Sequence, residues 1–141
     1  MIYKERIDSY NCIHKEWRNK DGRLHREDGP AYICYHSNNI LMIEQFWFYG
    51  HLHRANGPSE IQYSNSGAIT NNRYYLYGEQ HRKNGPAVIW YNDDGSIDFE
   101  IFFISGKRLG NDEEGFWALW ERLTEVERQH PNILKTLVRY S

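Results

Sequence analysis

Histidine and arginine stand side by side at three places in this chain, each 28 residues from the next. Imidazole nitrogens can bind a transition metal, and guanidinium groups can bind phosphate or carboxylate. The chain also places Cys12 two residues before His14, and these residue types can act as a nucleophile and its base. We call the six repeated residues the His-Arg ladder: His25, Arg26, His53, Arg54, His81 and Arg82.

A metal site built from successive histidines conflicts with the expected geometry. If each unit contributes two strands, equivalent residues lie roughly 9 to 10 Å apart, because neighbouring strands are about 4.8 Å apart. A zinc ion needs each imidazole nitrogen within about 2.1 Å. We therefore expect no metal and no cofactor, and we expect each imidazole to bond to a neighbouring turn instead.

The arginines of the ladder fit two roles. Together with nearby aromatic residues they could form a nucleic-acid surface. Alternatively, each guanidinium stacks on a Tyr or Trp of an adjacent unit, or bonds to turn carbonyls and to Asp28. The net charge of -2 and the acidic residues Glu27, Asp28, Asp93 and Asp94 favour the structural role. Nucleic-acid binding through the ladder is the alternative function.

Catalysis has less support. The chain contains no glycine-rich phosphate loop, no His-Glu-x-x-His helix and no Gly-x-Ser-x-Gly elbow. Nothing in the sequence locates a third group that would orient Cys12 and His14. We therefore expect a protein without enzymatic activity.

The ladder belongs to a longer motif that indicates the architecture. Gly-x-x-His-Arg-x-(Asp/Asn)-Gly-Pro-(Ala/Ser) begins at Gly22, Gly50 and Gly78. A strict repeat usually means one supersecondary unit stacked on itself, because a single unit cannot bury its apolar face. Gly106 falls on the same period without a His-Arg pair, and the segment around Trp17 reads as a degenerate leading strand. Atypical end units are expected in such a stack.

Each unit contains two strand-like runs separated by turn residues. The first follows Gly-Pro (31–35, 59–63 and 87–91), and the second, apolar at nearly every position, precedes the next glycine (46–49, 74–77 and 102–105). Ser, Asn, Asp and Gly between them predict turns. The result is one β-hairpin per unit and a mainly β fold: an elongated antiparallel meander of about eight short strands.

Alternate positions of the first run differ in how much they vary. Ile33, Ile61 and Ile89 are constant, whereas the intervening positions change freely between units. Because strand side chains alternate between faces, we expect the constant set to face a shared core and the varying set to face solvent or a partner. This variable face is the candidate partner-binding surface: Tyr32, Cys34, Glu60, Gln62, Val88 and Trp90.

The Gly-Pro step predicts a sharp bend before each first run. Asp or Asn before the glycine tolerates a left-handed backbone, and glycine permits positive φ. Proline lacks the amide hydrogen that a central strand donates to its neighbour. The residues concerned are Asp28, Gly29, Asn56, Gly57, Asn84 and Gly85.

The composition changes after Gly110. Residues 111–114 resemble a helix start, and Phe116, Leu119 and Leu123 recur at helical spacing, which predicts an amphipathic helix to about Arg128. Pro131 suits the first turn of a second, shorter helix. We therefore divide the chain into a repeat domain (1–110) and a helical tail (111–141). We expect the tail to form a helical cap that packs on the repeat domain and covers one face of the sheet; the alternative is a docking helix for a partner.

Bulk properties limit the setting of the protein. Aromatic residues make up 16% of the 141 residues, which suits a thin β structure that needs much core from few side chains. The two cysteines form neither a disulfide framework nor a zinc motif, so we expect a reducing, cytoplasmic compartment. The N-terminus lacks the apolar region of a signal peptide, no transmembrane run is present, and we expect no membrane partner.

The cadence Tyr-x-x-Gly…His-x-x-Gly-Pro-x-x-x-x-Tyr resembles MORN repeats (membrane occupation and recognition nexus), which stack β-hairpins into an elongated sheet. It is closer still to the His-Arg-x-x-Gly-Pro-Ala repeat proteins of phages, giant viruses and some bacteria. The resemblance covers residues 17 to 108 and implies a non-catalytic scaffold or interaction module. It also suggests a viral or phage protein that binds and inhibits a host factor in the host cytoplasm.

Overall fold

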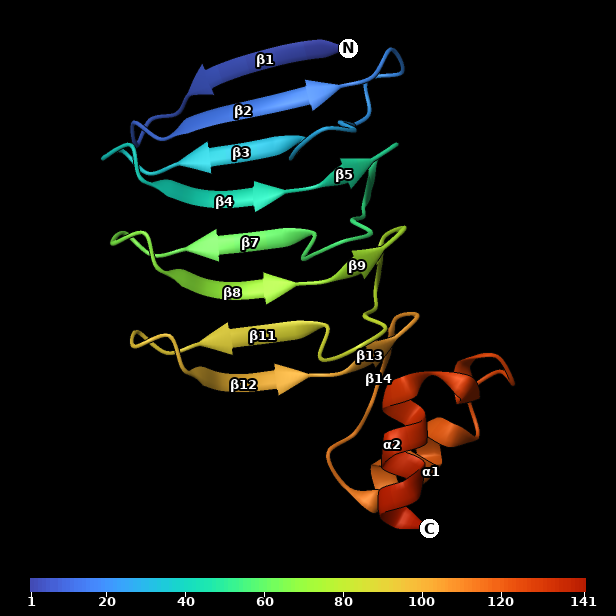
Figure 1. Cartoon of the computed structure of the whole chain (residues 1–141). Coiled ribbons are helices and arrows are strands. Elements are labelled where there is room, and N and C mark those ends of the chain that lie inside the picture. The colour runs from blue at the N-terminus through green and yellow to red at the C-terminus, as the bar shows by residue number, and fades with distance from the viewer.

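The computed structural model describes residues 1–141 and contains one antiparallel sheet of eight strands in a single layer (Figure 1). Each strand pairs with its neighbour along the chain, apart from the short hairpins described below, so the expected meander is confirmed. The strands, in spatial order, are β1 (Ile2–Ile7), β2 (Ile13–Arg18), β3 (Tyr32–Tyr35), β4 (Leu41–Gln45), β7 (Glu60–Tyr63), β8 (Ile69–Arg73), β11 (Val88–Tyr91) and β12 (Ile97–Ile101).

The 28-residue period sets the register of this sheet. Ile33 lies opposite Glu44, which lies opposite Ile61, and the same row continues through Asn72 to Ile89. Residues directly opposite one another in a sheet share a face. The three constant isoleucines therefore line up on one face, as the repeat predicts.

The position of the second strand in each hairpin differs from the prediction. The aromatic runs do not pair with the first strands; the more polar segments just before them, β4, β8 and β12, do so. Asn is a poor strand residue by propensity, yet cross-strand hydrogen bonds such as Asn71 Nδ2 to Gln62 Oε1 (2.9 Å) hold β8 in the sheet.

The aromatic runs instead begin a column of short hairpins along one end of the sheet (Figure 1). Each turn consists of two residues with positive φ, for example Tyr49 (47°) and Gly50 (82°). This geometry matches the twist of a two-residue hairpin, although it strains a residue other than glycine at the first position. The hairpins are β5 (Trp47–Phe48) with β6 (His51–Leu52), β9 (Tyr75–Leu76) with β10 (Glu79–Gln80), and β13 (Phe103–Ile104) with β14 (Lys107–Arg108).

The tail forms two helices, α1 (Glu113–Trp120) and α2 (Pro131–Tyr140), with a 3-10 turn, η1 (Glu127–Gln129), between them. Pro131 begins α2 as expected, but α1 ends eight residues before the predicted Arg128. Thr124 Oγ1 accepts the amide of Glu127, whose carboxylate accepts the amide of Thr124. This reciprocal cap starts a new turn and so excludes one continuous helix.

The main apolar core lies where the tail meets the last short hairpin. It joins Ile104 and Leu109 to Phe116, Leu119, Leu123 and Ile133. Strand β12 remains exposed along most of its length. The tail therefore caps the end of the repeat domain, as expected, but the helices pack against β13–β14 at the end of the hairpin column and not on a face of the main sheet (Figure 1). Neither helix has the length and apolar character needed to cross a membrane.

Candidate functional site

Each histidine of the ladder completes a turn of the following unit. Its Nδ1 accepts the backbone N–H of the first turn residue 24 positions later: His25 from Tyr49 (3.0 Å), His53 from Tyr77 (3.1 Å) and His81 from Ser105 (3.0 Å). The expectation that each imidazole bonds to a neighbouring turn is thus confirmed. An accepting Nδ1 must be unprotonated. Burial agrees with this state, because it lowers the pKa of His53 and of His81.

Aromatic contacts reinforce two of these ties. The His25 ring lies 4.2 Å from the Tyr49 ring, and the His53 ring lies 4.1 Å from the Tyr77 ring. The ring of each tyrosine thus packs on the same imidazole that accepts a hydrogen bond from the backbone N–H of that tyrosine. This packing helps to offset the strain of the left-handed backbone at the tyrosine.

Each arginine of the ladder is held flat between an aromatic ring and a glycine. Its Cζ lies 4.0 Å from the Trp17 centroid in Arg26, 3.8 Å from Phe46 in Arg54 and 4.0 Å from Tyr74 in Arg82. In all three units Nη1 donates to a proline carbonyl at 3.2 Å. Both predicted contacts, stacking on a ring and bonding to a turn carbonyl, are therefore present.

This packing explains the motif glycine better than the predicted left-handed bend does. Asp28, Asn56 and Asn84 all lack positive φ, and among the three glycines only Gly85 has it (137°). A Cβ added at Gly29, Gly57 or Gly85 would lie 3.2, 3.0 or 3.0 Å from a guanidinium atom. Glycine is needed because the arginine lies directly against its backbone.

The variable face is less accessible than the alternation of the strand predicts. Cys34, Val88 and Glu60 are buried, with 1%, 3% and 9% of their surface exposed, whereas Tyr32, Gln62 and Trp90 are half-buried. The expectation that all six face solvent was wrong for the three buried residues. Neighbouring strands carry large side chains on the same face, and these cover the smaller residues between them.

Polar contacts occupy the middle of this face. The Glu60 carboxylate accepts hydrogen bonds from Gln45 Nε2 (2.6 Å) and Gln62 Nε2 (3.2 Å), and Arg73 Nε lies 3.5 Å away. At the β12 edge the face becomes aromatic, because the Trp90 ring stacks on Phe99 with centroids 5.8 Å apart. The most open large side chains of the variable face thus gather near β12.

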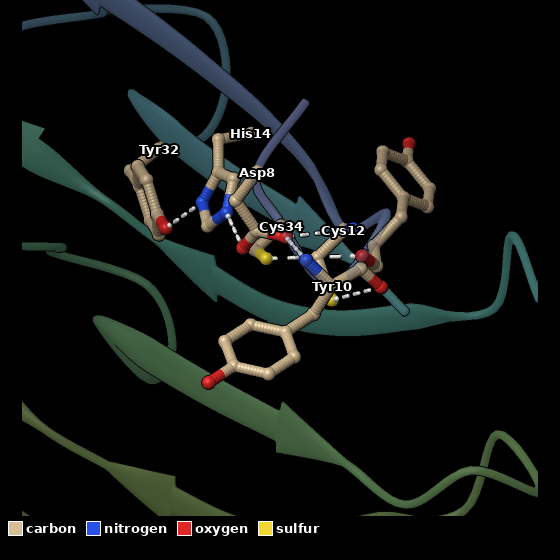
Figure 2. A network of polar contacts seen from close by, with 7 residues as sticks. Asp8, Tyr10, Cys12, His14, Tyr32 and Cys34 are labelled. Carbon is tan, nitrogen blue, oxygen red and sulfur yellow. Dashed lines mark hydrogen bonds and ion pairs between the residues drawn. The ribbon is translucent and has the colours of Figure 1, made fainter. Parts of the chain in front are cut away.

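A second polar cluster ties the first hairpin to β3 (Figure 2). His14 bridges two residues: its Nε2 lies 2.8 Å from Asp8 Oδ2, and its Nδ1 lies 2.7 Å from the Tyr32 hydroxyl. Asp8 Oδ1 also accepts the backbone N–H groups of Tyr10 and Cys12. The group that orients His14, which the sequence did not locate, is therefore Asp8.

Three groups in and beside this cluster have pKa values shifted from their ordinary values. Burial raises the pKa of Tyr32 to about 12 and also raises the pKa of the Cys34 thiol. The hydrogen bond from His14 lowers the pKa of Asp8. Asp8, His14 and Tyr32 thus form a hydrogen-bonded bracket in which the phenol is protonated and the carboxylate is ionised.

Sequence reasoning missed Asp8 and Tyr32 as partners of His14. They lie on a turn and a strand whose pairing is known only from the sheet register, in which His14 is opposite Cys34 and Tyr32 is opposite Glu16. The alternation of residues along β2 would place His14 and Tyr32 on one face once that register is given.

Comparisons with protein-family models, with curated proteins and with solved structures gave no significant match to this chain.

Proposed function

We propose that this chain is a non-catalytic repeat module that binds a protein partner. The observation that carries the proposal is the identical use of the motif in all three units. Every ladder histidine completes a turn and every ladder arginine stacks on a ring. The conserved positions of the repeat thus serve the scaffold, and the residues that differ between units supply any specificity.

The aromatic end of the variable face is the best candidate for direct contact. Trp90 is half-buried against Phe99, which is 46% exposed, and Ile97 on the same strand is 52% exposed. Tryptophan and phenylalanine are enriched where proteins meet, and tryptophan is prominent among the residues that dominate binding energy. The contact surface we propose is therefore centred on Trp90, with Gln62 and Tyr32 farther along the same face.

The setting we propose is the cytoplasm, where a viral or phage protein of this repeat type would occupy and inhibit a host factor. Both Cys12 and Cys34 are free thiols, which agrees with a reducing compartment. Nucleic-acid binding through the ladder ranks second. The flat faces of the guanidinium groups are covered by a ring on one side and a glycine on the other, so bases cannot stack on them.

The proposal is tested by capturing partners from host lysate with and without nuclease. We expect a protein that resists nuclease treatment and high salt, and that is lost with Trp90→Ala at a temperature where circular dichroism shows this variant to be folded. Trp117→Ala, on an exposed part of α1 (36% exposed), is the matched control and should retain the partner. Capture that disappears with nuclease, or equal losses with both variants, would contradict the proposal.

A further inference from the structure

Two neighbouring hollows lie on the side of the short hairpins, and we treat the pair as one groove. One, of about 430 Å³, lies between the second and third motif loops, and the other, of about 390 Å³, lies between the third loop and α2. They meet at Asn84, which lines both. The groove therefore runs from the repeat loops to the helical tail.

The charge of this groove is opposite to that of the whole chain. Five cationic residues line it and no Asp or Glu does, although the chain has 19 acidic residues and a net charge of -2. We call it the basic groove, and its cations are Arg54, Arg82, Lys83, Lys135 and Arg139. Such a local concentration of one charge attracts the opposite charge.

Most donors of these cations are free. Arg54 and Arg82 each donate one hydrogen bond within the chain, from Nη1 to a proline carbonyl, and the stacked ring fixes the orientation of the guanidinium. The side chains of Lys83, Lys135 and Arg139 are exposed. None of the three belongs to any of the six ion pairs of the chain. Pre-oriented, unpaired guanidinium groups bind carboxylates with little loss of conformational freedom.

The equivalent hollow one unit earlier is electrically balanced. Glu27 and Asp28 line it together with Arg26 and Arg54, and Asp28 pairs with Arg26 at 3.1 Å. The position after the ladder arginine thus changes from Glu27 to Ala55 to Lys83 along the stack. Attraction for an anion is therefore confined to the C-terminal half of the hairpin column.

We propose that the basic groove binds an acidic peptide segment of the protein partner; this inference rests on the proposed function and adds the chemistry of the partner. A peptide fits better than single-stranded nucleic acid because the aromatic rings here are already covered. Tyr74 lies beneath Arg82, and Phe102 and Tyr140 pack against the C-terminal core. Bases bind single-strand sites largely by stacking on open rings.

The spacing of the ladder sets the spacing of the acidic residues. Arg54 and Arg82 are one unit apart, roughly 9 to 10 Å, since a unit adds two strands to the sheet. A polyproline II segment has three residues per turn and a rise of about 3.1 Å per residue, so every third side chain recurs on one side at about 9.3 Å. Carboxylates at every third residue therefore match successive arginines.

The test measures binding of two fluorescein-labelled probes to the full chain by anisotropy. The first probe is a peptide with glutamate at every third position in a proline background, and the second is an oligothymidine of equal charge. The test variant is the double substitution Lys83→Glu with Lys135→Glu, which alters exposed side chains outside the ladder. Two further exposed lysines, Lys4→Glu with Lys20→Glu, form the control with the same change in net charge. Circular dichroism melts establish that both variants fold.

We expect the peptide to bind at low salt and the test variant to weaken it by about tenfold or more, as reversal of contacting charges does, with less than about a twofold effect of the control. No peptide binding, or equal effects of the two variants, would overturn the proposal. Tighter binding of oligothymidine with the same sensitivity would assign the groove to nucleic acid instead. A peptide with the same residues in clustered order should bind less well, and equal affinity would refute the three-residue spacing.

The two proposals fail in different ways. If lysate yields no protein partner, the proposed function fails whatever the peptide does. If a captured partner depends on Trp90 but is retained by the Lys83→Glu, Lys135→Glu variant, the proposed function stands and the acidic segment is refuted.

Discussion

Gly57→Ala in the central unit measures how much the guanidinium packing contributes to stability. The new Cβ would lie 3.0 Å from Nη1 and 3.1 Å from Cζ of Arg54, closer than ordinary contacts allow. The backbone of Gly57 lies outside the left-handed region, so alanine adds no conformational strain there. The guanidinium of Arg54 must therefore shift by a few tenths of an ångström from its place between Gly57 and Phe46.

The expected loss follows from the contacts that the arginine gives up. Stacking of a partly exposed guanidinium on a ring contributes about 0.5 to 1 kcal/mol. The hydrogen bond from the charged Nη1 to the Pro58 carbonyl contributes about 1.5 kcal/mol. Replacing glycine by alanine also stabilises the folded state by about 0.4 to 1 kcal/mol, because alanine restricts the unfolded chain. The net loss is therefore at most about 1 to 2 kcal/mol, or about 3 to 6 °C in melting temperature for a domain of this size, if both contacts are lost.

The assay is a double-mutant cycle followed by thermal and urea unfolding. In an Arg54→Ala background the same Gly57→Ala change should be neutral or slightly stabilising, because no guanidinium remains to be displaced. Gly85→Ala should cost more than Gly57→Ala, since its φ of 137° adds backbone strain to the same contact. Equal destabilisation by Gly57→Ala with and without Arg54 would refute the explanation of the motif glycine.

Two further predictions concern the histidines and the tail. Burial lowers the pKa of His53, His81 and His130 in the folded chain, so the unfolded chain binds more protons below about pH 6.5. Stability is therefore fully present above that pH and falls as the pH drops from 6.5 through the folded pKa values. Melting temperatures measured between pH 7.5 and 5.5 test this expectation. The variant His53→Asn keeps a hydrogen-bond acceptor that does not titrate, so its melting temperature should depend less steeply on pH. An unchanged pH dependence in this variant would contradict the explanation. Asn132→Ala should destabilise the tail by about 1 to 3 kcal/mol, because the buried Nδ2 donates to the Gly85 carbonyl at 3.0 Å. Tryptophan fluorescence during unfolding reports the loss, and exposed Asn111→Ala is the control that should melt normally.

The sequence was informative about features that repeat with a fixed period. The 28-residue register and the alternation at Ile33, Ile61 and Ile89 predicted the first strand of each hairpin and the meander. Strand β8 was not predicted because Asn71 and Asn72 have low strand propensity, which pairing on both sides overrides.

Contacts between distant parts of the chain could not be predicted in this way. The basic groove exists only because α2 packs beside the third loop, which places the hollow lined by Lys135 next to the one lined by Lys83. The Asp8–His14–Tyr32 bracket needs the register of three strands. Neither depends on a local pattern, so only the assembled fold reveals them.

The bond from each ladder histidine to a turn 24 residues later gives the stack a direction. Because a ribosome releases the chain from its N-terminus, each ladder histidine emerges before the backbone N–H that will donate to its imidazole. Each new turn can therefore close on a unit that has already left the ribosome. Loss of C-terminal units would leave only an unused acceptor at the boundary, whereas loss of N-terminal units would leave a turn amide without its imidazole acceptor. Synthesis proceeds from the N-terminus to the C-terminus, and in each of these hydrogen bonds the acceptor likewise precedes the donor in the chain.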